Sequence, residues 1–208
     1  MISIKNLIFS YENDLIFDDF NFTTDSNFTI IKGPSGCGKS TFLKLLTGNL
    51  KPSSAGFFSV STDSEKALLL QEDGLFPWMT GIDNIYTTLS LDKKEIESHP
   101  LYKYTESFID KYVYKMSYGQ RRIIELFRVI LLKPKLLCLD EPFNFLDYKN
   151  RKQIMDFLLT EDFQKETKVV MSTHYTEDTS NLNLETYYFD GNLPVKKLLN
   201  EVEFKNYE

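Results

Sequence analysis

The sequence predicts an α/β protein in which the strands of a parallel sheet alternate with helices. A glycine-rich turn at residues 33–41 lies between a β-branched, apolar run at 28–31 and a run of helical apolar spacing at 42–46. Two further segments are expected to be strands buried on both faces of a sheet: the apolar run at 136–139 and the segment beginning at Lys168, which is apolar at 169–171. A strand–turn–helix unit combined with buried parallel strands defines an α/β layer architecture.

The composition is that of an ordinary globular protein. The 208 residues suit one domain, or one domain with a small inserted lobe, and 42% of them are hydrophobic. No apolar run approaches the roughly 18 residues of a membrane-spanning helix, and the N-terminus lacks the layout of a secretion signal, so we expect a cytoplasmic protein. The net charge of −6 disfavours nonspecific binding to nucleic acid. Cys37 and Cys138 fit a reducing compartment, and we expect no disulfide.

Two strands are expected near the N-terminus, at residues 2–9 and 15–22. Tyr11 follows the first of them. An aromatic ring at a strand end, upstream of a phosphate-binding loop, can stack on a nucleotide base. It can equally be a strand-end tyrosine half buried in the sheet, and its position alone favours that simpler interpretation.

The glycine-rich turn matches G-x-x-x-x-G-K-[ST], with the strand before it and the helix after it that this motif requires. The glycines let several backbone N–H groups point inward as a cradle for phosphate oxygens, and the helix N-terminus adds partial positive charge. Lys39 is expected to reach the β- and γ-phosphates, and the Ser40 hydroxyl to ligate Mg²⁺. The chain is therefore expected to bind a nucleoside triphosphate. The predicted residues of this loop are Gly33, Pro34, Ser35, Gly36, Cys37, Gly38, Lys39, Ser40 and Thr41.

Short strands are expected next, at residues 57–60 and 66–70. Gln71 follows the second of them. A polar amide at the open end of a nucleotide-binding sheet can contact Mg²⁺ or a water, or it can be an ordinary surface-loop residue. Phe76 and Trp78 come shortly afterwards, around a proline. Such a cluster suits a docking surface or a local core, and core packing is the simpler interpretation.

Residues 74–115 are expected to form a small, polar, helical lobe inserted into the α/β core. Helices are expected to begin at Thr80 and Asp92, and the dipeptide of His99 and Pro100 interrupts the segment. His99 has no ligand-like neighbours in the sequence, so we expect a surface histidine.

A strong helix is expected to begin after Ser117, which is a good N-cap residue, and to bury an apolar face along 123–131. Ser117 and Gly119 at the start of a helix also offer a second anion site. Taken alone, the segment favours the simpler interpretation, an ordinary capped helix.

Two carboxylates follow the buried strand at 136–139, and ligands of open α/β sheets collect at this end of the strands. Asp140 is expected to bind Mg²⁺ through water, paired with Ser40. Glu141 is expected to orient and deprotonate the water that attacks the γ-phosphate. The strand beginning at residue 168 leads to His174, which can contact the γ-phosphate.

The last part of the chain is expected to complete the sheet. Asp147 begins the next helix as a cap or as an interface group. Residues 185–189, followed by a turn at 190–192, are expected to form a closing hairpin, and residues 195–208 a short polar tail.

The motifs and their order along the chain resemble those of the ATP-binding subunits of ABC transporters. The resemblance covers residues 4–191. The segment 33–41 looks like the Walker A loop of that family, and 136–140 like its Walker B strand. Glu141 takes the place of the catalytic glutamate. These two Walker motifs alone would indicate only a P-loop ATPase.

Further matches narrow the family. Gln71 is similar to the Q-loop glutamine, His174 to the switch histidine and Tyr11 to the adenine-stacking aromatic, while residues 144–147 occupy the D-loop. The catalytic residues implied by the resemblance are Glu141, His174 and Gln71. The implied metal ligands are Ser40, Gln71 and Asp140.

Residues 116–120 resemble the signature Leu-Ser-Gly-Gly-Gln of the family, with two departures. Met116 stands for leucine and Tyr118 for the first glycine. Ser117 and Gly119 keep the hydroxyl and the close backbone approach that an anion site needs. The resemblance therefore implies that Ser117, Gly119 and Gln120 contact nucleotide.

The resemblance implies an α/β P-loop NTPase with a RecA-like core at residues 1–73 and 116–208. This core carries an antiparallel β subdomain, and a small helical subdomain is inserted at about residues 74–115. The segment between Gln71 and Ser117 is short for the family, so this helical subdomain is expected to be trimmed.

The resemblance also implies a head-to-tail homodimer with two ATP molecules and Mg²⁺ at its interface. Each ATP is held by one copy's phosphate loop and capped by the other copy's segment 117–120. Hydrolysis opens the dimer, and this motion drives separate transmembrane permease subunits at the inner face of the cell membrane, alongside a substrate-binding protein in an importer. The docking helix of the permease is expected near Phe76 and Trp78. The stretch 71–78 is most similar to importers of nitrate, sulfonate or taurine type.

Two other functions remain compatible with a phosphate loop. A soluble ABC-type ATPase acting on nucleic acid or the ribosome usually has two cassettes or a long coiled-coil insertion, and this chain has neither. A regulatory module that only holds ATP would not need the hydrolytic residues Asp140, Glu141 and His174. We therefore expect a transport ATPase with no nucleic-acid partner.

Overall fold

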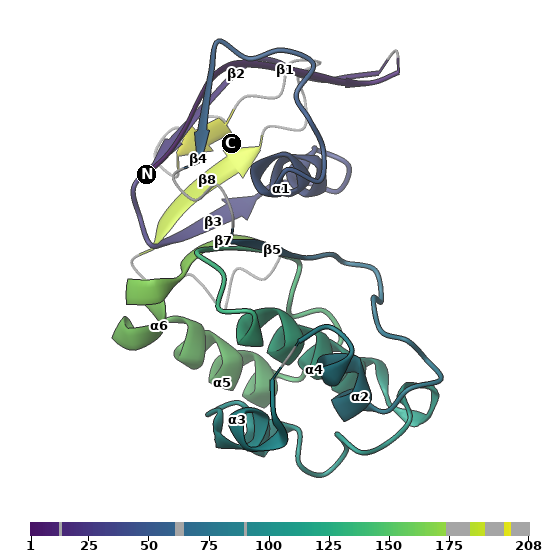
Figure 1. Cartoon of the computed structure of the whole chain (residues 1–208). Helices are drawn as coiled ribbons and strands as arrows, with labels where there is room; N and C mark the ends of the chain where they lie inside the picture. The colour runs from purple at the N-terminus through teal and green to yellow at the C-terminus, as the bar shows by residue number, and fades with distance from the viewer. Residues whose placement is uncertain (13, 61–64, 90, 174–183, 190–197, 201–208) are drawn as a thin grey trace.

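The computed structural model describes residues 1–12, 14–60, 65–89, 91–173, 184–189 and 198–200. Within these residues, a sheet of six strands runs through the molecule in the order β5-β6-β7-β3-β8-β9 (Figure 1). The first five strands pair in parallel, and β9 is antiparallel to β8. The strands are β3 (Phe28–Lys32), β5 (Lys66–Leu69), β6 (Leu136–Asp140), β7 (Lys168–Ser172), β8 (Glu185–Phe189) and β9 (Leu198–Asn200).

A smaller antiparallel sheet, in the order β2-β1-β4, lies above the central sheet in Figure 1. Its strands are β1 (Ile2–Tyr11), β2 (Asp14–Thr24) and β4 (Phe57–Val60). The two predicted N-terminal strands are confirmed, and both are longer than the alternating pattern indicates because their backbone pairing continues to Tyr11 and Asp14. The combination of parallel and antiparallel sheets confirms the α/β class.

The helices lie on both sides of the central sheet, α1 with the small sheet and the others on the opposite side (Figure 1). They are α1 (Lys39–Thr47), α2 (Gly81–Tyr86), α3 (Lys93–Ser98), α4 (Tyr118–Leu131), α5 (Tyr148–Leu158) and α6 (Glu161–Glu166). Between α3 and α4 the chain forms two short 3₁₀ turns, η1 (Tyr102–Tyr104) and η2 (Val113–Lys115).

Helix ends follow local sequence signals. Gly48 terminates α1 in the left-handed conformation, with φ of 82°. Thr80 and Asp83 form a capping box at the start of α2, and Asp92 and Glu95 form another at the start of α3. The predicted helix starts at Thr80 and Asp92 are confirmed. Much of the segment between α3 and α4 is irregular, however, and forms two 3₁₀ turns in place of a longer helix.

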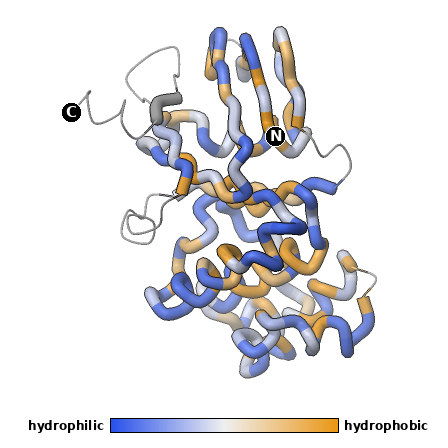
Figure 2. Tube along the Cα trace, turned by 90° about the vertical axis from the view of Figure 1, so that its left-hand side faces the viewer, coloured by the Kyte–Doolittle hydropathy of each residue, from blue (hydrophilic) through white to orange (hydrophobic). Residues whose placement is uncertain are grey.

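Successive residues of the buried strands face two separate cores. In β6, Leu137 and Leu139 pack with the helices on one side of the sheet, whereas Leu136 and Cys138 pack with α1 and the small sheet on the other. This alternation explains why the strand is apolar throughout: both of its faces are covered. Figure 2 shows the resulting band of hydrophobic residues in the central strands, between the two layers.

Helix α1 is anchored by aromatic packing. Phe42 is fully buried, and four phenylalanine rings surround it at centroid separations of 5.0 to 6.3 Å. The four are Phe17, Phe20 and Phe22 of β2 and Phe189 of β8. Large aromatic side chains dominate core energetics, so this cluster fixes α1 against both sheets.

Two expectations from the sequence are wrong. His99 is not a surface histidine: its ring packs on Phe127 at 5.3 Å and Phe157 at 5.4 Å, and its Nδ1 accepts a 3.2 Å hydrogen bond from the Leu101 N–H. The expected polar tail contains β9, which supplies the second strand of the predicted hairpin. A three-residue edge strand is too short to produce a recognisable periodicity.

None of the helices in the described part of the chain is long and apolar enough to cross a membrane. Cys37 and Cys138 are both buried, and neither forms a disulfide with another described residue. Burial raises the pKa of the Cys138 thiol.

Candidate active site

Four neighbouring strands bring the predicted site residues to one edge of the sheet. Because β5, β6, β7 and β3 are parallel neighbours, their C-terminal ends lie together. Gln71 follows β5, Asp140 ends β6, and the glycine-rich loop follows β3. Strand β7 lies between the last two, since Ser172 pairs with Asp140 on one side and with Ile31 on the other.

The glycine-rich loop has the backbone conformation of a phosphate cradle. Gly36 and Gly38 have φ of 76° and 96°, in the left-handed region that favours glycine. Gly33 is required for a second reason: a Cβ at this position would lie 2.8 Å from the Phe189 carbonyl oxygen and 2.9 Å from Cys37 Sγ. The loop thus packs tightly against β8, and Cys37 fills the space beneath it.

Lys39 spans this loop. Its ammonium group donates hydrogen bonds to the carbonyl oxygens of Gly33 at 2.8 Å and Pro34 at 2.9 Å, and the residue is only 5% exposed. A buried cation requires such partners. The contacts hold the loop in its curled shape and keep a positive charge at the place where phosphate is predicted. Ser40 follows in the first turn of α1 and is partly exposed.

Tyr11 ends β1 close to the start of α1. Its hydroxyl lies 3.4 Å from Thr41 Oγ1, and its ring packs edge-on against Phe9. The residue is 42% exposed. The geometry therefore leaves part of the ring accessible, and base stacking by Tyr11 stays a prediction.

The carboxylate of Asp140 is buried and held in place by its neighbouring strand. Ser172 Oγ donates a 2.6 Å hydrogen bond to Asp140 Oδ1 and accepts a 3.0 Å bond from the Glu141 N–H. Sequence reasoning missed Ser172. The available signal was a single hydroxyl at the end of an otherwise apolar strand, at the level where the other strands carry polar residues.

Glu141 turns the chain away from the sheet. It has φ of 46°, which is uncommon for a residue with a side chain and marks a functional or strained position. Asn144 Nδ2 donates a 2.9 Å hydrogen bond to Glu141 Oε2, which orients the carboxylate. An oriented carboxylate at the end of a parallel strand can act as a general base.

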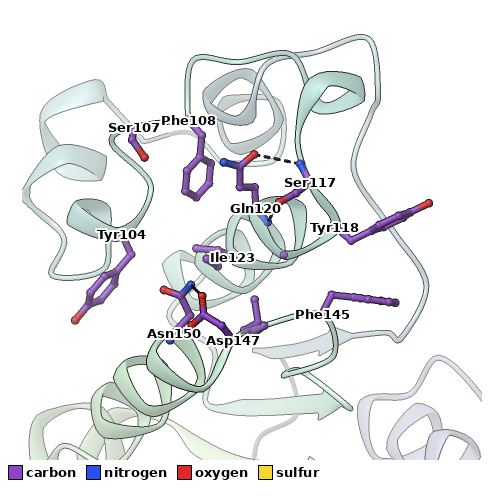
Figure 3. Close-up of a pocket in the computed structure, with 12 residues that line it drawn as sticks. Tyr104, Ser107, Phe108, Ser117, Tyr118, Gln120, Ile123, Phe145, Asp147 and Asn150 are labelled. Carbon is purple, nitrogen blue, oxygen red and sulfur yellow. Dashed lines mark hydrogen bonds between the residues drawn. The ribbon is translucent and has the colours of Figure 1, made fainter.

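Ser117 caps α4 through a capping box. Its hydroxyl accepts from the Gln120 N–H at 3.2 Å, and Gln120 Oε1 accepts from the Ser117 N–H at 3.1 Å (Figure 3). The predicted N-cap is confirmed. The first turn of α4 therefore has a serine hydroxyl at its exposed tip, with the positive end of the helix behind it.

Ser117 belongs to a pocket of about 690 Å³ between α4 and the loop that precedes α5. Asp147 lies in the same pocket and caps α5, its carboxylate accepting a 2.8 Å hydrogen bond from the Asn150 N–H. At the rim, Tyr118 and Phe145 lie side by side with ring centroids 5.3 Å apart (Figure 3). Both side chains are exposed.

The structure does not bring Ser117, Gly119 and Gln120 to the chain's own phosphate loop. The pocket that they line contains no residue of that loop. Helix α1, which follows the phosphate loop, and helix α4 lie on opposite sides of the central sheet (Figure 1). His174 lies outside the described residues. One chain therefore carries two separate candidate anion sites.

Magnesium binding would use oxygen ligands from the edge of the central sheet where its parallel strands end. The described residues contain no group of three or more His, Cys, Asp or Glu side chains that could hold a metal. Mg²⁺ needs no such group when it binds a nucleotide, because one or two protein oxygens, phosphates and water complete its octahedron. The buried carboxylate of Asp140 and the hydroxyl of Ser40 have the chemistry for this role.

Comparisons with known proteins agree with this geometry. The family model described as ABC transporter matches residues 17–144. The ergothioneine transport ATP-binding protein EgtV of Helicobacter pylori (strain G27) is 34% identical over 204 residues, covering 89% of this chain and 95% of the relative. The taurine import ATP-binding protein TauB of Escherichia coli O157:H7 is 31% identical over 192 residues, covering 86% of this chain and 75% of the relative.

Two solved structures share the fold. The dimeric structure of the ABC transporter cassette MJ0796 superposes with a TM-score of 0.77 at 22% identity, covering 90% of this chain and 94% of that one. A post-hydrolysis state of the same cassette, bound to ADP and Pi, gives a TM-score of 0.74 at 21% identity over the same shares. The predicted fold class and family resemblance are confirmed. The chain belongs to the ABC transporter family, as one of its ATP-binding, ATP-hydrolysing subunits.

Proposed function

We propose that two copies of this chain close head to tail around two ATP molecules and thereby drive an importer. One observation carries the proposal: the phosphate loop and the Ser117 segment lie apart in a single chain, although both have the form of an anion site. A second copy supplies the missing half of each site. The dimeric form of the MJ0796 cassette supports this arrangement.

The triphosphate and its metal are held from one side by the phosphate loop. Lys39 exchanges its contacts with the carbonyl oxygens for contacts with the β- and γ-phosphates, which are stronger acceptors. Ser40 and Gln71 would hold Mg²⁺ directly, and Asp140 would hold it through water. Tyr11 stacks on the base. When bound, the metal neutralises charge that develops on the phosphates.

The γ-phosphate is reached from the other side by the neighbouring copy. Its Ser117 hydroxyl and the Gly119 N–H group at the start of α4 face the phosphate oxygens. Gln120 contributes its side-chain amide, because its backbone N–H donates to Ser117 Oγ. Glu141 accepts a proton from the attacking water, while His174 and Gln71 position that water and the phosphate. Loss of the γ-phosphate removes the bridge between the copies, so the dimer opens.

An exposed aromatic surface beside Gln71 is the place where we expect the permease. The segment after β5 pairs with the segment before α4: Tyr114 N–H donates to the Pro77 carbonyl at 3.2 Å, and Val113 N–H to the Met79 carbonyl at 2.9 Å. Four exposed rings lie on this paired segment, and we name them the aromatic surface. They are Phe76, Trp78, Tyr112 and Tyr114.

This surface belongs to the segment that we assign to the helical subdomain, about residues 74–115. Residues of this segment, such as Ile85 and Ile109, pack in the same core as α4. A permease that binds the aromatic surface therefore pushes on α4 and on Ser117 at its tip. It also holds the chain at the inner face of the membrane. The names of the two sequence relatives, one a transport and one an import ATP-binding protein, support permease partners, and a substrate-binding protein would complete an importer.

The experiment is ATP hydrolysis and association of the purified chain with Mg²⁺ and ATP. Wild type is expected to hydrolyse slowly, and Glu141→Gln to lose at least 100-fold in turnover while forming a stable ATP-bound dimer. The matched control is Glu161→Gln, which changes an exposed carboxylate of α6 and is expected to behave as wild type. A Glu141→Gln protein that turns over normally, or that stays monomeric with ATP by light scattering, would overturn the proposal.

A further inference from the structure

Four charged side chains of helix α4 contact the loop that carries Gln71. Their partners are side-chain and backbone atoms of residues 70–74. Three of the contacts involve the exposed part of the loop: Arg121 Nη1 lies 3.2 Å from Asp73 Oδ2, Arg128 Nη2 donates 2.9 Å to the Gly74 carbonyl, and Glu125 Oε1 accepts 2.6 Å from the Gly74 N–H. The fourth side chain is Arg122, which is buried, as is Glu125.

Arg122 joins the Gln71 loop to the carboxylate end of β6. Its Nη1 donates 2.6 Å to the Leu70 carbonyl. Its Nη2 donates to the carbonyl oxygens of Asp140 at 2.8 Å and Glu141 at 3.1 Å, and its Nε donates 3.1 Å to that of Pro142. One guanidinium thus binds the ends of two neighbouring strands, directly beside three predicted site residues.

The charge of Arg122 is balanced by Glu125, one turn along α4. Arg122 Nη1 and Glu125 Oε2 are 3.1 Å apart, and both side chains are 4% exposed. Burial raises the pKa of Glu125, while the Gly74 N–H and Arg122 lower it. A buried ion pair is held only when its hydrogen bonds are satisfied, and a planar fork that donates in several directions is specific to arginine.

We propose that Arg122 and Glu125 form a positioning pair for ATP hydrolysis, which sets the Gln71 loop and the Asp140–Glu141 turn relative to Ser117 at the tip of α4. Neither residue needs to touch the nucleotide. Because both lie on the helix that Ser117 caps, a displacement of the loop by the permease moves the Ser117 segment and the carboxylates as one unit. This inference rests on the proposed function. It adds the residues that couple the permease-contacted loop to the carboxylates and to Ser117.

The simpler alternative is that the pair only stabilises the fold. The two possibilities differ in what an apolar replacement does. Exchanging a buried ion pair for apolar side chains of similar volume commonly preserves stability. It cannot, however, hold four backbone carbonyls in place. A measurement of ATP turnover in such a variant therefore distinguishes a positioning role of the pair from a purely structural one.

The test is the double variant Arg122→Met/Glu125→Leu together with Arg122→Lys, which keeps a cation but loses the fork. In both, we expect the Kd for ATP, by calorimetry, to stay within about twofold of wild type, because Lys39 and the phosphate loop are untouched. We expect kcat to fall at least tenfold, a loss of about 1.4 kcal/mol or more in transition-state stabilisation. Arg121→Gln, which removes an exposed contact to the same loop, is the control and is expected to keep kcat.

Wild-type kcat in the folded double variant, or in Arg122→Lys, would overturn the positioning role. If the double variant does not fold, Arg122→Lys decides alone. Failure of the proposed function gives a different pattern, in which wild type itself does not hydrolyse ATP and Glu141→Gln does not dimerise. A wild type that hydrolyses ATP, with Arg122 variants that match it, contradicts only this inference.

Discussion

The Ser172 hydroxyl donates a 2.6 Å hydrogen bond to Asp140 Oδ1, so a residue of β7 fixes the carboxylate that ends β6. The same oxygen accepts from the Glu141 N–H, at the residue where the backbone enters the left-handed region. A single serine therefore fixes the Asp140 carboxylate and the backbone at Glu141. Hydrogen bonds to a charged group are stronger than neutral ones, so this contact matters for stability and for catalysis.

The first prediction concerns Ser172→Ala. We expect the free energy of unfolding to fall by about 1–3 kcal/mol, since the variant removes the partner of a buried carboxylate. We expect kcat for ATP to fall about tenfold, because the Asp140 carboxylate becomes free to rotate. Urea unfolding and steady-state hydrolysis measure the two effects. Ser3→Ala, which changes a buried serine of β1, is the control and should leave kcat unchanged. Normal kcat in Ser172→Ala would refute the orienting role.

The second prediction concerns Gly119→Ala. In an ordinary helix this change stabilises by about 1 kcal/mol. Here the new Cβ would lie 2.8 Å from the Phe145 carbonyl oxygen, so we expect the opposite sign, with a loss of about 1–3 kcal/mol. The displaced Phe145 loop should also weaken the ATP-bound dimer of Glu141→Gln. Thermal unfolding and analytical ultracentrifugation measure these effects.

The control for Gly119 is Gly48→Ala. A Cβ at Gly48 meets nothing within 4 Å, and only the left-handed φ of 82° opposes it. That variant should lose about 1 kcal/mol of stability through strain and leave the dimer intact. A Gly119→Ala protein that is more stable than wild type would show that the close approach to Phe145 is unimportant.

The third prediction tests the Ser117 face. We expect Ser117→Arg, in the Glu141→Gln background, to bind ATP normally and to remain a monomer. The longer cationic side chain occupies the place of the neighbouring copy's phosphate and repels its Mg²⁺. Small-angle scattering with Mg²⁺ and ATP measures association. Ser98→Arg, at the exposed end of α3, should dimerise as its parent does. A normal dimer in Ser117→Arg would remove this segment from the interface.

The fourth prediction is a pH dependence of stability caused by His99. Burial, with a contribution from Lys133, lowers the pKa of His99 to about 4 from its usual 6.5. The folded state therefore disfavours protonated His99. The contribution of neutral His99 to the free energy of unfolding is complete above pH 6.5 and is lost as the pH falls from 6.5 towards 4. We expect wild type to lose about 1 kcal/mol more than His99→Gln between pH 7 and pH 5, allowing for partial exposure. Urea unfolding at both pH values measures this difference. Equal losses in the two proteins would contradict it.

Much of the site follows from local sequence because each motif carries its own backbone signal. The loop at 33–41 combines glycines at positions of positive φ with a helix start, and all of this lies within nine consecutive residues. Asp140 is recognisable because a carboxylate directly after a buried strand has few structural reasons to be there. The capping box of Ser117 and Gln120 is equally local.

The site residues that could not be predicted from the sequence make contacts with residues far away along the chain. Arg122 binds Leu70 and Asp140, and Ser172 binds Asp140, through contacts that depend on strand order. An arginine in a helix ordinarily faces solvent, so the pattern gives no reason to bury this one. His99 was misjudged for the same cause: the rings that cover it come from α4 and α5, far along the chain.

Trp78 is the chain's single tryptophan, and it is 65% exposed on the aromatic surface beside the Gln71 loop. The protein therefore carries a built-in optical reporter, with all indole fluorescence arising at one known location. Transfer of that indole from water to a permease groove shifts its emission to shorter wavelength and protects it from collisional quenchers. Unlabelled protein can thus be titrated with membrane partners, in the presence or absence of nucleotide, and the engagement of the membrane subunit read directly from its spectrum.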